Sequence, residues 1–264
     1  MYFNIEEYVQ EEKNKLKQEV SNFPTTPTLV VIQCGNDMAS NAYIKGKRKD
    51  CEEVGIKFIH EHIESDFVLN VVRKVNQYNS NPNVNGVIIQ LPLPDCEVNF
   101  ADIIDDAKDV DGFNTNSKFF PCTPKGIIDW IKCKNINLDG ANVVIIGRSD
   151  IVGKPLAKMM LEENATVTMC HSHTQSLAYH TYGADIIVSA VGKPNTIQPN
   201  MVNCMAVVVD VGINRDENNK LCGDVDPSCG KKCDVTPVPK GIGLTTRLAL
   251  LQNVIAAYKL QNNC

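Results

Sequence analysis

Residues 142–155, N-V-V-I-I-G-R-S-D-I-V-G-K-P, predict a buried β-strand, a turn and a helix in direct succession. A dinucleotide-binding fold places a pyrophosphate at such a junction, against backbone N–H groups at the helix N-terminus. The usual fingerprint is G-x-G-x-x-G. Here the glycines are Gly147 and Gly153, Ser149 holds the middle position, and the spacing is one residue longer. A plain strand–turn–helix connection is the alternative interpretation.

The next predicted strand, residues 165–172, bears on which dinucleotide would bind. NAD sites usually end this strand with Asp or Glu, which holds the ribose 2′-hydroxyl. Residues 170–173 read C-H-S-H, without an acid, and Arg148 in the turn suits a 2′-phosphate because guanidinium binds phosphate bidentately. The pattern favours NADP, while His171 and His173 are equally well interpreted as loop residues without a role.

Predicted strands alternate with predicted helices, which is typical of βαβ units and parallel sheets. The predicted strands are 28–35, 56–63, 86–94, 142–147, 165–172, 184–192 and 206–214. The predicted helices are 5–21, 40–54, 66–79, 123–132 and 245–260, besides the one that follows Gly153. We expect Ser40 as the N-cap of the second helix and Gly55 as its end. The pattern restarts near 115–125, so two α/β sheets are more economical than one.

Composition excludes several classes of protein. The chain has 264 residues, 43% of them hydrophobic, and a net charge of −5, which suits globular domains and disfavours nucleic-acid binding. No stretch reaches the length of a membrane span and the N-terminus is charged, so we expect a soluble cytoplasmic protein.

The 11 cysteines form no C-x-x-C pair. The closest group is Cys222, Cys229 and Cys233, without a nearby histidine, so we expect reduced thiols and no metal site.

Residues 42–49, A-Y-I-K-G-K-R-K, place four cations in the last five positions. A helical projection at about 100° per residue shows that these charges do not form one patch. The solvent side receives Lys45 and Lys49, with Arg48 at the flank. Lys47 instead follows Tyr43 on an apolar stripe of the opposite face. Such a lysine either extends to solvent or points into a cavity, where an amine can take part in proton transfer.

Taken together, the motifs resemble the family of bifunctional methylenetetrahydrofolate dehydrogenase/cyclohydrolases, called FolD. The matching segments lie in the family's order along nearly the whole chain from about residue 28. They are 40–56, 86–94 (G-V-I-I-Q-L-P-L-P), 108–113 (K-D-V-D-G-F), 121–126, 147–155 (G-R-S-D-I-V-G-K-P), 191–194, 210–215 (D-V-G-I-N-R), 223–225 (G-D-V) and 236–243. The lengthened glycine turn is the family's own form.

The resemblance implies a two-domain α/β fold and two consecutive reactions. An N-terminal α/β substrate domain, residues 1–122 plus 245–264, and a Rossmann-type NADP domain, residues 123–244, would flank a cleft. The resemblance implies oxidation of 5,10-methylenetetrahydrofolate by NADP⁺ to the 5,10-methenyl cation. Hydrolysis to 10-formyltetrahydrofolate would follow, as a step of one-carbon metabolism. A homodimer is expected from the family.

Residue roles follow from the matching positions. Lys47 matches the lysine that handles protons during hydrolysis, and Gln90 matches the glutamine beside it, a neutral amide that can orient the amine. Tyr43 matches the aromatic residue that stacks on the benzoyl ring of folate. Asp111 matches the carboxylate that accepts hydrogen bonds from the pterin, whose N–H groups are donors. The alternatives are a strand end for Gln90 and a turn or cap residue for Asp111.

Further matching positions concern the cofactor and a loop near the substrate. The expected NADP contacts are Gly147, Arg148, Ser149, Gly153, Ser172 and Ile213, with Thr123 near the interdomain hinge. The alternative for Ser172 is a loop hydroxyl. Pro239 and Gly241 belong to the loop that lies between folate and nicotinamide in the family.

The sequence departs from the family in this loop. The family reads P-G-G-x-G-P-M-T, whereas residues 239–246 read P-K-G-I-G-L-T-T, with Lys240, Leu244 and Thr245 at the changed positions. We expect Lys240 to restrict backbone angles that Gly permits, and to point either to solvent or to the glutamate tail of folate. The N-terminus also lacks the usual Gly-Lys pair. These changes leave open the relative rates of the two activities.

Other functions remain possible on the sequence alone. One is a shikimate-type two-domain dehydrogenase, against which Lys47, Gln90 and K-D-V-D-G argue. Another is a family member with the dehydrogenase activity only. A third is a non-catalytic NADP-binding or nucleic-acid-binding protein, which the acidic balance and the divided charges of residues 42–49 disfavour.

Overall fold

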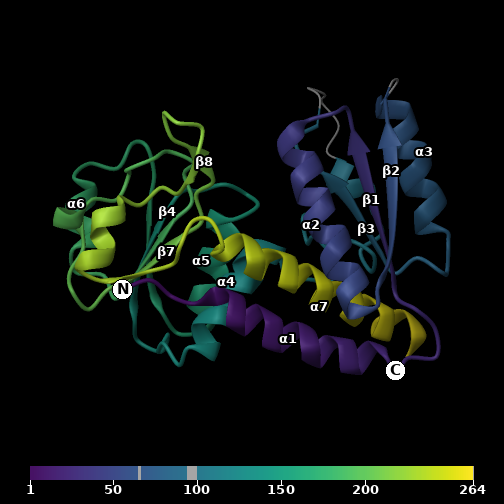
Figure 1. The fold of residues 1–264 in the computed structure, drawn as a ribbon, viewed down its shortest axis with the longest axis horizontal. Coiled ribbons are helices and arrows are strands. Elements are labelled where there is room, and N and C mark those ends of the chain that lie inside the picture. Colours follow the sequence, from purple (N-terminus) through teal and green to yellow (C-terminus); the bar gives the residue numbers. More distant parts are fainter. Residues whose placement is uncertain (65–66, 94–99, 264) are drawn as a thin grey trace. The chain divides into compact units, whose positions relative to one another are not determined.

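The computed structural model describes residues 1–64, 67–93 and 100–263. The chain forms two compact units, of which one comprises residues 1–10 and 123–246 and the other residues 11–122 and 247–264. The boundaries between the two units fall within helix α1 (Ile5–Val20), at the start of α4 (Cys122–Cys133) and within α7 (Ile242–Asn262). These three helices are labelled in Figure 1. We call them the five-stranded unit and the three-stranded unit after their parallel sheets.

The three-stranded unit has strand order β2-β1-β3, with β1 (Thr28–Cys34), β2 (Lys57–Ile63) and β3 (Gly86–Gln90) all parallel. Helix α2 (Met38–Val54) and helix α3 (Phe67–Asn79) connect the strands. A buried cluster packs α3 against alternate residues of β1 and β3, among them Val30, Ile32, Val71, Val75, Val87 and Ile89. Because side chains alternate across a strand, the intervening residues, such as Gln90, face the other side of the sheet.

The five-stranded unit has strand order β10-β7-β6-β4-β5, and every pair is parallel. Its strands are β4 (Asn142–Ile146), β5 (Thr166–Cys170), β6 (Ile186–Ser189), β7 (Val207–Asp210) and β10 (Asp234–Val235). Helices α5 (Gly153–Glu162) and α6 (Leu177–Thr181) follow β4 and β5. A hairpin of β8 (Asn214–Arg215) and β9 (Leu221–Cys222) extends from the chain after β7. Strand β5 lies on one side of β4, and the next strand along the chain, β6, lies on its other side. The strand order therefore reverses at β4, and α/β sheets bind ligands at the carboxyl end of such a switch point.

The predicted mixed α/β architecture is confirmed, and each predicted strand and helix has a counterpart. The expected N-cap was wrong: α2 begins at Met38, and the Asp37 carboxylate accepts from the Ser40 N–H at 2.7 Å. Ser40 Oγ instead donates to the Leu91 carbonyl at 3.0 Å. Gly55 does end the helix, at φ +93°, where a left-handed residue is favourable. Strand 86–94 ends at Gln90; residue 94, like residue 66 of the third helix, lies outside the described part.

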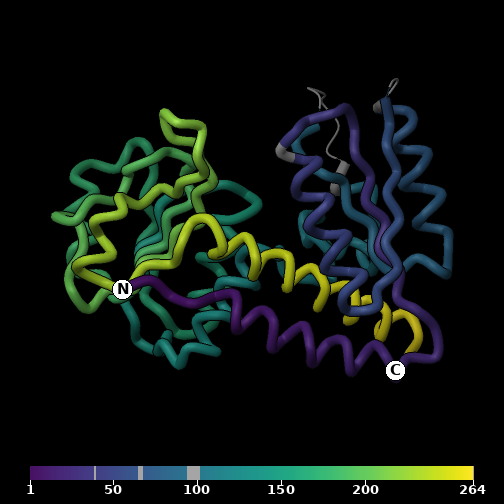
Figure 2. Tube along the Cα trace, viewed as in Figure 1, coloured from purple at the N-terminus to yellow at the C-terminus, as the bar shows by residue number. Residues whose placement is uncertain are grey.

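The first ten residues lie in the five-stranded unit, whereas the expected division kept them with the substrate domain. The Val235 N–H donates to the Met1 carbonyl at 2.9 Å, and the Phe3 N–H donates to the Val235 carbonyl at 3.2 Å. The Phe3 ring packs edge-on against buried Trp130, with ring centroids 4.9 Å apart. Figure 2 shows the N-terminus of the trace at this unit. The other boundary falls after Thr246 rather than after residue 244.

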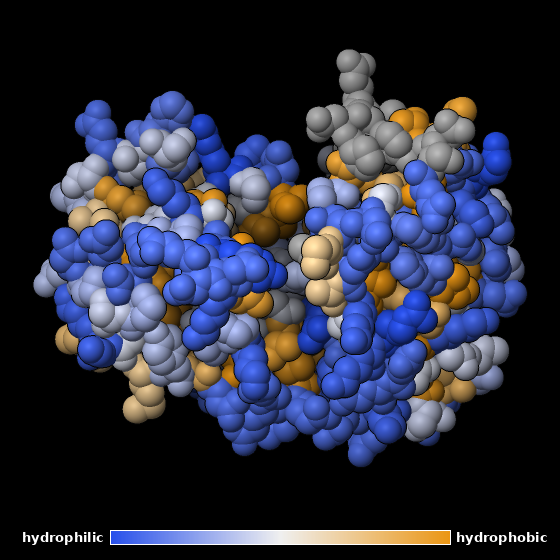
Figure 3. Space-filling view, turned by 45° about the horizontal axis from the view of Figure 1, so that its top comes forward, coloured by the Kyte–Doolittle hydropathy of each residue, from blue (hydrophilic) through white to orange (hydrophobic). Residues whose placement is uncertain are grey.

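The described residues show the state of the cysteines, the length of the apolar helices and the polarity of the surface. All nine described cysteines are free thiols, and no group of three or more His, Cys, Asp or Glu side chains among the described residues could hold a metal ion. No described helix is both long enough and apolar enough to cross a membrane. Hydrophilic residues cover most of the surface of each unit in the face drawn in Figure 3.

Candidate functional site

Lys47 is held against the sheet of the three-stranded unit. Its side chain belongs to α2, is 9% exposed, and its Nζ donates to Gln90 Oε1 at 3.1 Å. The Gln90 amide nitrogen donates to the Leu91 carbonyl at 2.8 Å, which directs Oε1 toward the amine. Lys45 and Lys49 are exposed, as the helical projection predicted. The structure therefore joins a buried amine and a neutral amide from two distant segments.

Arg48 lies at the flank of α2, as predicted, and its guanidinium stacks over the Phe58 ring at 4.9 Å from the centroid. In the basic stretch, Lys45 and Lys49 thus face solvent, and Arg48 contacts the Phe58 ring. Lys47 is the basic residue of positions 45–49 that is buried.

Tyr43 lies one turn before Lys47 on α2 and is partly buried. Burial raises the pKa of its phenol, against a smaller opposing effect of the Arg247 guanidinium. The ring therefore remains a neutral aromatic surface at physiological pH. Arg247, from α7, is a neighbour that the sequence pattern did not reveal.

The two aspartates of K-D-V-D-G have different environments. Asp109 is buried and accepts from the Asn114 N–H at 2.8 Å, and burial raises its pKa. Asp111 is partly exposed, and its carboxylate accepts no hydrogen bond from a residue in the described ranges, although its backbone carbonyl accepts from the Cys122 N–H at 3.3 Å. Asp109 thus supports the turn, while the Asp111 carboxylate has acceptor capacity for a ligand.

The two glycines that frame the turn of the five-stranded unit, Gly147 and Gly153, leave no room for a side chain of their own. Gly147 has φ +114°, and a Cβ there would lie 2.4 Å from the Ala190 carbonyl oxygen. A Cβ on Gly153 would lie 2.2 Å from the Gly147 carbonyl oxygen. Both positions therefore require glycine, since the neighbouring atoms are backbone.

Backbone donors at this turn fit a pyrophosphate. Ser149 Oγ accepts from the N–H groups of Val152 and Gly153, at 3.2 and 3.4 Å, at the start of α5. The N–H groups of residues 148–151 donate to no residue of the described chain. Consecutive free N–H groups before a helix N-terminus are suited to bind phosphate oxygens.

Residues 170–173 follow β5 at the same edge of the sheet. The parallel pairing of Ile146 with Cys170 brings Arg148 beside His171. Partial burial lowers the pKa of His171, and the charges of Arg148 and His173 lower it further. The two histidine rings lie 5.9 Å apart, and Ser172 is exposed in the turn between them. Arg148 and Ser172 are thus available donors where β4 and β5 end.

The remaining predicted residues also lie in the five-stranded unit. Ile213 is 54% exposed just after β7, at the same edge of the sheet as the glycine turn. Thr123 Oγ1 lies 3.1 Å from Thr246 Oγ1. Pro239 is exposed and Gly241 is buried.

The altered loop contains an ion pair and buried hydroxyl contacts. Lys240 has φ +72°, is exposed, and its Nζ lies 3.1 Å from Glu6 Oε1. Thr245 is buried, and its Oγ1 donates to the Ile242 carbonyl at 2.9 Å. The Leu244 N–H donates to the Gly241 carbonyl at 2.9 Å, which closes the first turn of α7. Lys240 therefore contacts the N-terminal segment of its own unit.

Two buried aspartates organise the loops after β6 and β7. Asp224 is fully buried and accepts from the N–H groups of Val191 and Lys193, at 2.8 and 2.9 Å, and from Asn214 Nδ2 at 2.9 Å. Asp210 accepts from the Asp224 N–H at 2.9 Å. Burial, and to a lesser extent the nearby Asp224 charge, raise the pKa of Asp210 to about 6.

Sequence reasoning did not assign these two residues a role, although D-V-G (210–212) and G-D-V (223–225) were among the matching motifs. Asp210 also lines a pocket of about 560 Å³ within the five-stranded unit, together with Tyr2, Cys222 and Thr236. Asp210 and Asp224 are 14 positions apart, with the β8–β9 hairpin between them, so only the fold reveals that they form one network.

Comparison with known proteins identifies relatives along the whole chain. Residues 3–111 match the catalytic domain of the tetrahydrofolate dehydrogenase/cyclohydrolase family, and residues 121–262 match its NAD(P)-binding domain. Bifunctional protein FolD of Agathobacter rectalis is 45% identical, with 94% of this chain and 95% of that protein covered. The protein of the same name from Bacillus subtilis is 42% identical, with 96% and 95% covered.

Solved structures agree with this result. The bifunctional FolD enzyme from Campylobacter jejuni is 38% identical, with a TM-score of 0.95 over 100% of this chain and 99% of that chain. The Trypanosoma brucei FolD, solved with NADP and an inhibitor, is 27% identical, with a TM-score of 0.93 over 100% and 99%. A shikimate dehydrogenase from Aquifex aeolicus is 14% identical with a TM-score of 0.53 over 92% and 94%, a likeness of fold alone.

Proposed function

Because the chain belongs to the tetrahydrofolate dehydrogenase/cyclohydrolase family, we infer that it is a bifunctional enzyme of one-carbon metabolism. It oxidises 5,10-methylenetetrahydrofolate with NADP⁺ to 5,10-methenyltetrahydrofolate and hydrolyses this product to 10-formyltetrahydrofolate. The observation that carries the hydrolytic half is the contact between buried Lys47 and Gln90, 3.1 Å long. A buried amine held by a neutral amide is suited to move a proton to or from water.

We assign the substrate contacts to the three-stranded unit. Tyr43 stacks on the benzoyl ring, and its position one turn from Lys47 supports this role because the reacting carbon bridges the benzoyl nitrogen and the pterin. Lys47 relays the proton during hydrolysis, and Gln90 orients it. Asp111 accepts hydrogen bonds from the pterin, for which its free carboxylate is suited. Pro239 and Gly241, which belong to the five-stranded unit, are assigned to the substrate as well.

We assign the cofactor contacts to the five-stranded unit. NADP⁺, when bound, accepts the hydride. The N–H groups of residues 148–151 and the glycines that frame them hold the pyrophosphate. Arg148 and Ser172 hold the 2′-phosphate, and Ile213 lies against the cofactor. The absence of an acid from residues 170–173 supports NADP over NAD. Thr123, paired with Thr246, lies near the cofactor as well.

Oxidation requires less from side chains than hydrolysis does. Loss of hydride leaves a cation shared by two nitrogens, so no strong base is needed for that step, and alignment is the main requirement. Hydrolysis needs proton transfer, which is why Lys47 matters more for the second reaction than for the first.

One assay tests the assignment. The protein is mixed with 5,10-methylenetetrahydrofolate and NADP⁺, and absorbance is followed for NADPH and for the methenyl intermediate. NADPH without accumulation of methenyltetrahydrofolate supports both activities. Accumulation would instead support a dehydrogenase-only enzyme, and no reaction with NADP⁺ or NAD⁺ would contradict the function.

The expected homodimer, cytoplasmic location and lack of nucleic-acid binding belong to the same proposal. They rest on the family and on the acidic net charge of −5. Light scattering of the purified protein tests the dimer, and a salt-dependent gel shift would contradict the absence of nucleic-acid binding.

A further inference from the structure

Arg247 of α7 lies against the face of α2 that carries Tyr43 and Lys47. A Cβ on Gly46 would lie only 1.9 Å from Arg247 Nη1, so the guanidinium occupies the space that this glycine leaves. Gly46 lies between Tyr43 and Lys47 in the sequence of the helix. The influence of Arg247 on the pKa of Tyr43 is consistent with this proximity. The guanidinium is therefore a neighbour of the proposed folate contacts.

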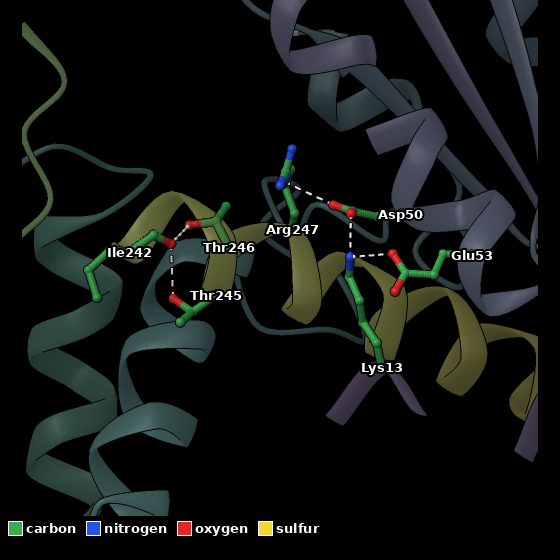
Figure 4. Close-up of polar contacts among 7 residues, drawn as sticks. All are labelled: Lys13, Asp50, Glu53, Ile242, Thr245, Thr246 and Arg247. Carbon is green, nitrogen blue, oxygen red and sulfur yellow. Dashed lines mark hydrogen bonds and ion pairs between the residues drawn. The ribbon is translucent and has the colours of Figure 1, made fainter. Parts of the chain in front are cut away.

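Buried charges hold Arg247 in this position. Its Nε lies 2.9 Å from Asp50 Oδ2. The other oxygen of the same carboxylate, Asp50 Oδ1, pairs with Lys13 Nζ at 2.5 Å. Lys13 Nζ also lies 2.9 Å from Glu53 Oε2. Figure 4 shows this arrangement, with the Asp50 carboxylate between the two cations. The Asp50 side chain is 4% exposed, so the pairing restrains the guanidinium strongly.

The hydrogen-bonding capacity of Arg247 is nevertheless unused. A guanidinium has five N–H donors, and none of those of Arg247 makes an aligned hydrogen bond to a residue within the described ranges. The contact with Asp50 is an ion pair outside hydrogen-bond geometry. In Figure 4 a terminal nitrogen is directed away from the carboxylate. Since 23% of the side chain is exposed, an acceptor can approach from solvent.

We propose that Arg247 binds a carboxylate of the glutamate tail of the folate substrate. This inference rests on the proposed function. An amide link joins the glutamate directly to the benzoyl ring that Tyr43 is proposed to stack on, so its α-carboxylate lies close to that ring. A guanidinium beside the ring matches a carboxylate in charge and in planar geometry. Asp50, Lys13 and Glu53 act through Arg247 as positioning residues.

The test compares two substrates that differ only in the tail. Wild type and Arg247→Met are assayed with 5,10-methylenetetrahydrofolate and with 5,10-methylenetetrahydropteroate, which lacks the glutamate. We expect Arg247→Met to lower kcat/KM for the glutamylated substrate about tenfold or more, through KM, with a much smaller change for the pteroate. Arg247→Lys should recover part of the loss, since it keeps the charge without the planar fork.

Gly46→Ala tests whether the position of the Arg247 guanidinium matters, because this variant keeps the charge of Arg247 but moves it. The added methyl group displaces Nη1, and alanine favours the helix, so the variant should fold and show the same selective loss. Lys45→Met, on the solvent face of α2, is the matched control for loss of one charge and should keep the wild-type ratio.

Equal losses for both substrates, or an unchanged ratio in Arg247→Met and Gly46→Ala, would overturn the role of Arg247. If Arg247→Met does not fold, the ratio measured for Gly46→Ala decides. Failure of the wild type to turn over either substrate is a different outcome, because it overturns the proposed function and this inference with it.

Discussion

Lys47 Nζ lies 3.1 Å from Gln90 Oε1 and so connects the middle of helix α2 to the end of strand β3. Lys47→Met keeps the length and the apolar stem but removes the amine. We expect hydrolysis of 5,10-methenyltetrahydrofolate to fall at least about 100-fold, because a proton-transfer group contributes on that scale. Dehydrogenase activity should persist in part. Both activities are checked by following the absorbance of NADPH and of the methenyl intermediate over time.

The control is Lys49→Met, which removes an exposed lysine from the same helix. It should retain both activities. Full hydrolysis by Lys47→Met would contradict the role given to this lysine.

Arg148 should determine the preference for NADP⁺. Arg148→Met removes the guanidinium beside His171, so we expect KM for NADP⁺ to rise about tenfold or more while the reaction with NAD⁺ changes little. Initial rates over a range of both cofactors measure this. Lys154→Met, an exposed cation on α5, is the control. A similar loss with NAD⁺ would show that Arg148 supports the turn rather than the 2′-phosphate.

Asp210 should make the five-stranded unit less stable as pH rises. The pKa of this carboxyl is raised to about 6 in the folded protein, from a model-peptide value near 4, by burial and by Asp224. The folded state therefore holds a proton that the unfolded state has lost, and stability falls between about pH 4 and pH 6. The contribution is at most about 3 kcal/mol.

Urea unfolding of wild type and Asp210→Asn at several pH values tests this expectation. The amide cannot ionise, so the stability of the variant relative to wild type should improve across the same interval. A constant difference between the two proteins from about pH 4 to pH 7 would show that the pKa of Asp210 is the same in the folded and unfolded states.

Lys13→Met should destabilise the three-stranded unit. Lys13 is buried and bridges Asp50 and Glu53, and its loss leaves the buried Asp50 with Arg247 alone. Breaking one partner of a buried ion pair costs about 3 kcal/mol or more, because a charge is left uncompensated. The free energy of unfolding in urea measures the effect. Lys15→Met, whose lysine is exposed, should change it little; equal effects of the two would contradict the prediction.

Lys240→Gly should stabilise the loop before α7. Lys240 has φ +72°, where a side chain is unfavourable, and its ion pair with Glu6 is exposed and contributes little. Lys240→Ala loses the same ion pair but keeps the Cβ. We expect the glycine variant to be more stable than the alanine variant by about 1 kcal/mol, as measured by thermal unfolding. Equal stability would mean that the backbone there relaxes at no cost.

The order of the elements and the inward side of α2 follow from local periodicity. Apolar β-branched runs predicted the strands, and the period of the helix separated Lys47 from Lys45 and Lys49 before any contact was known. Gly55 was predictable as a helix end because the left-handed conformation itself selects glycine. These features depend on neighbours within a few positions.

Contacts between distant segments were decided by the tertiary structure. The N-terminal residues pair with Val235, and Asp210 shares a network with Asp224. The Asp37 carboxylate, rather than Ser40, caps helix α2. Arg247 meets Asp50 because α7 packs beside α2, although the two residues are 197 positions apart (247 minus 50) in the sequence. Sequence alone therefore determined the elements and the residue types available for chemistry. Packing determined which of these residues face one another, since long-range contacts leave no periodic signal.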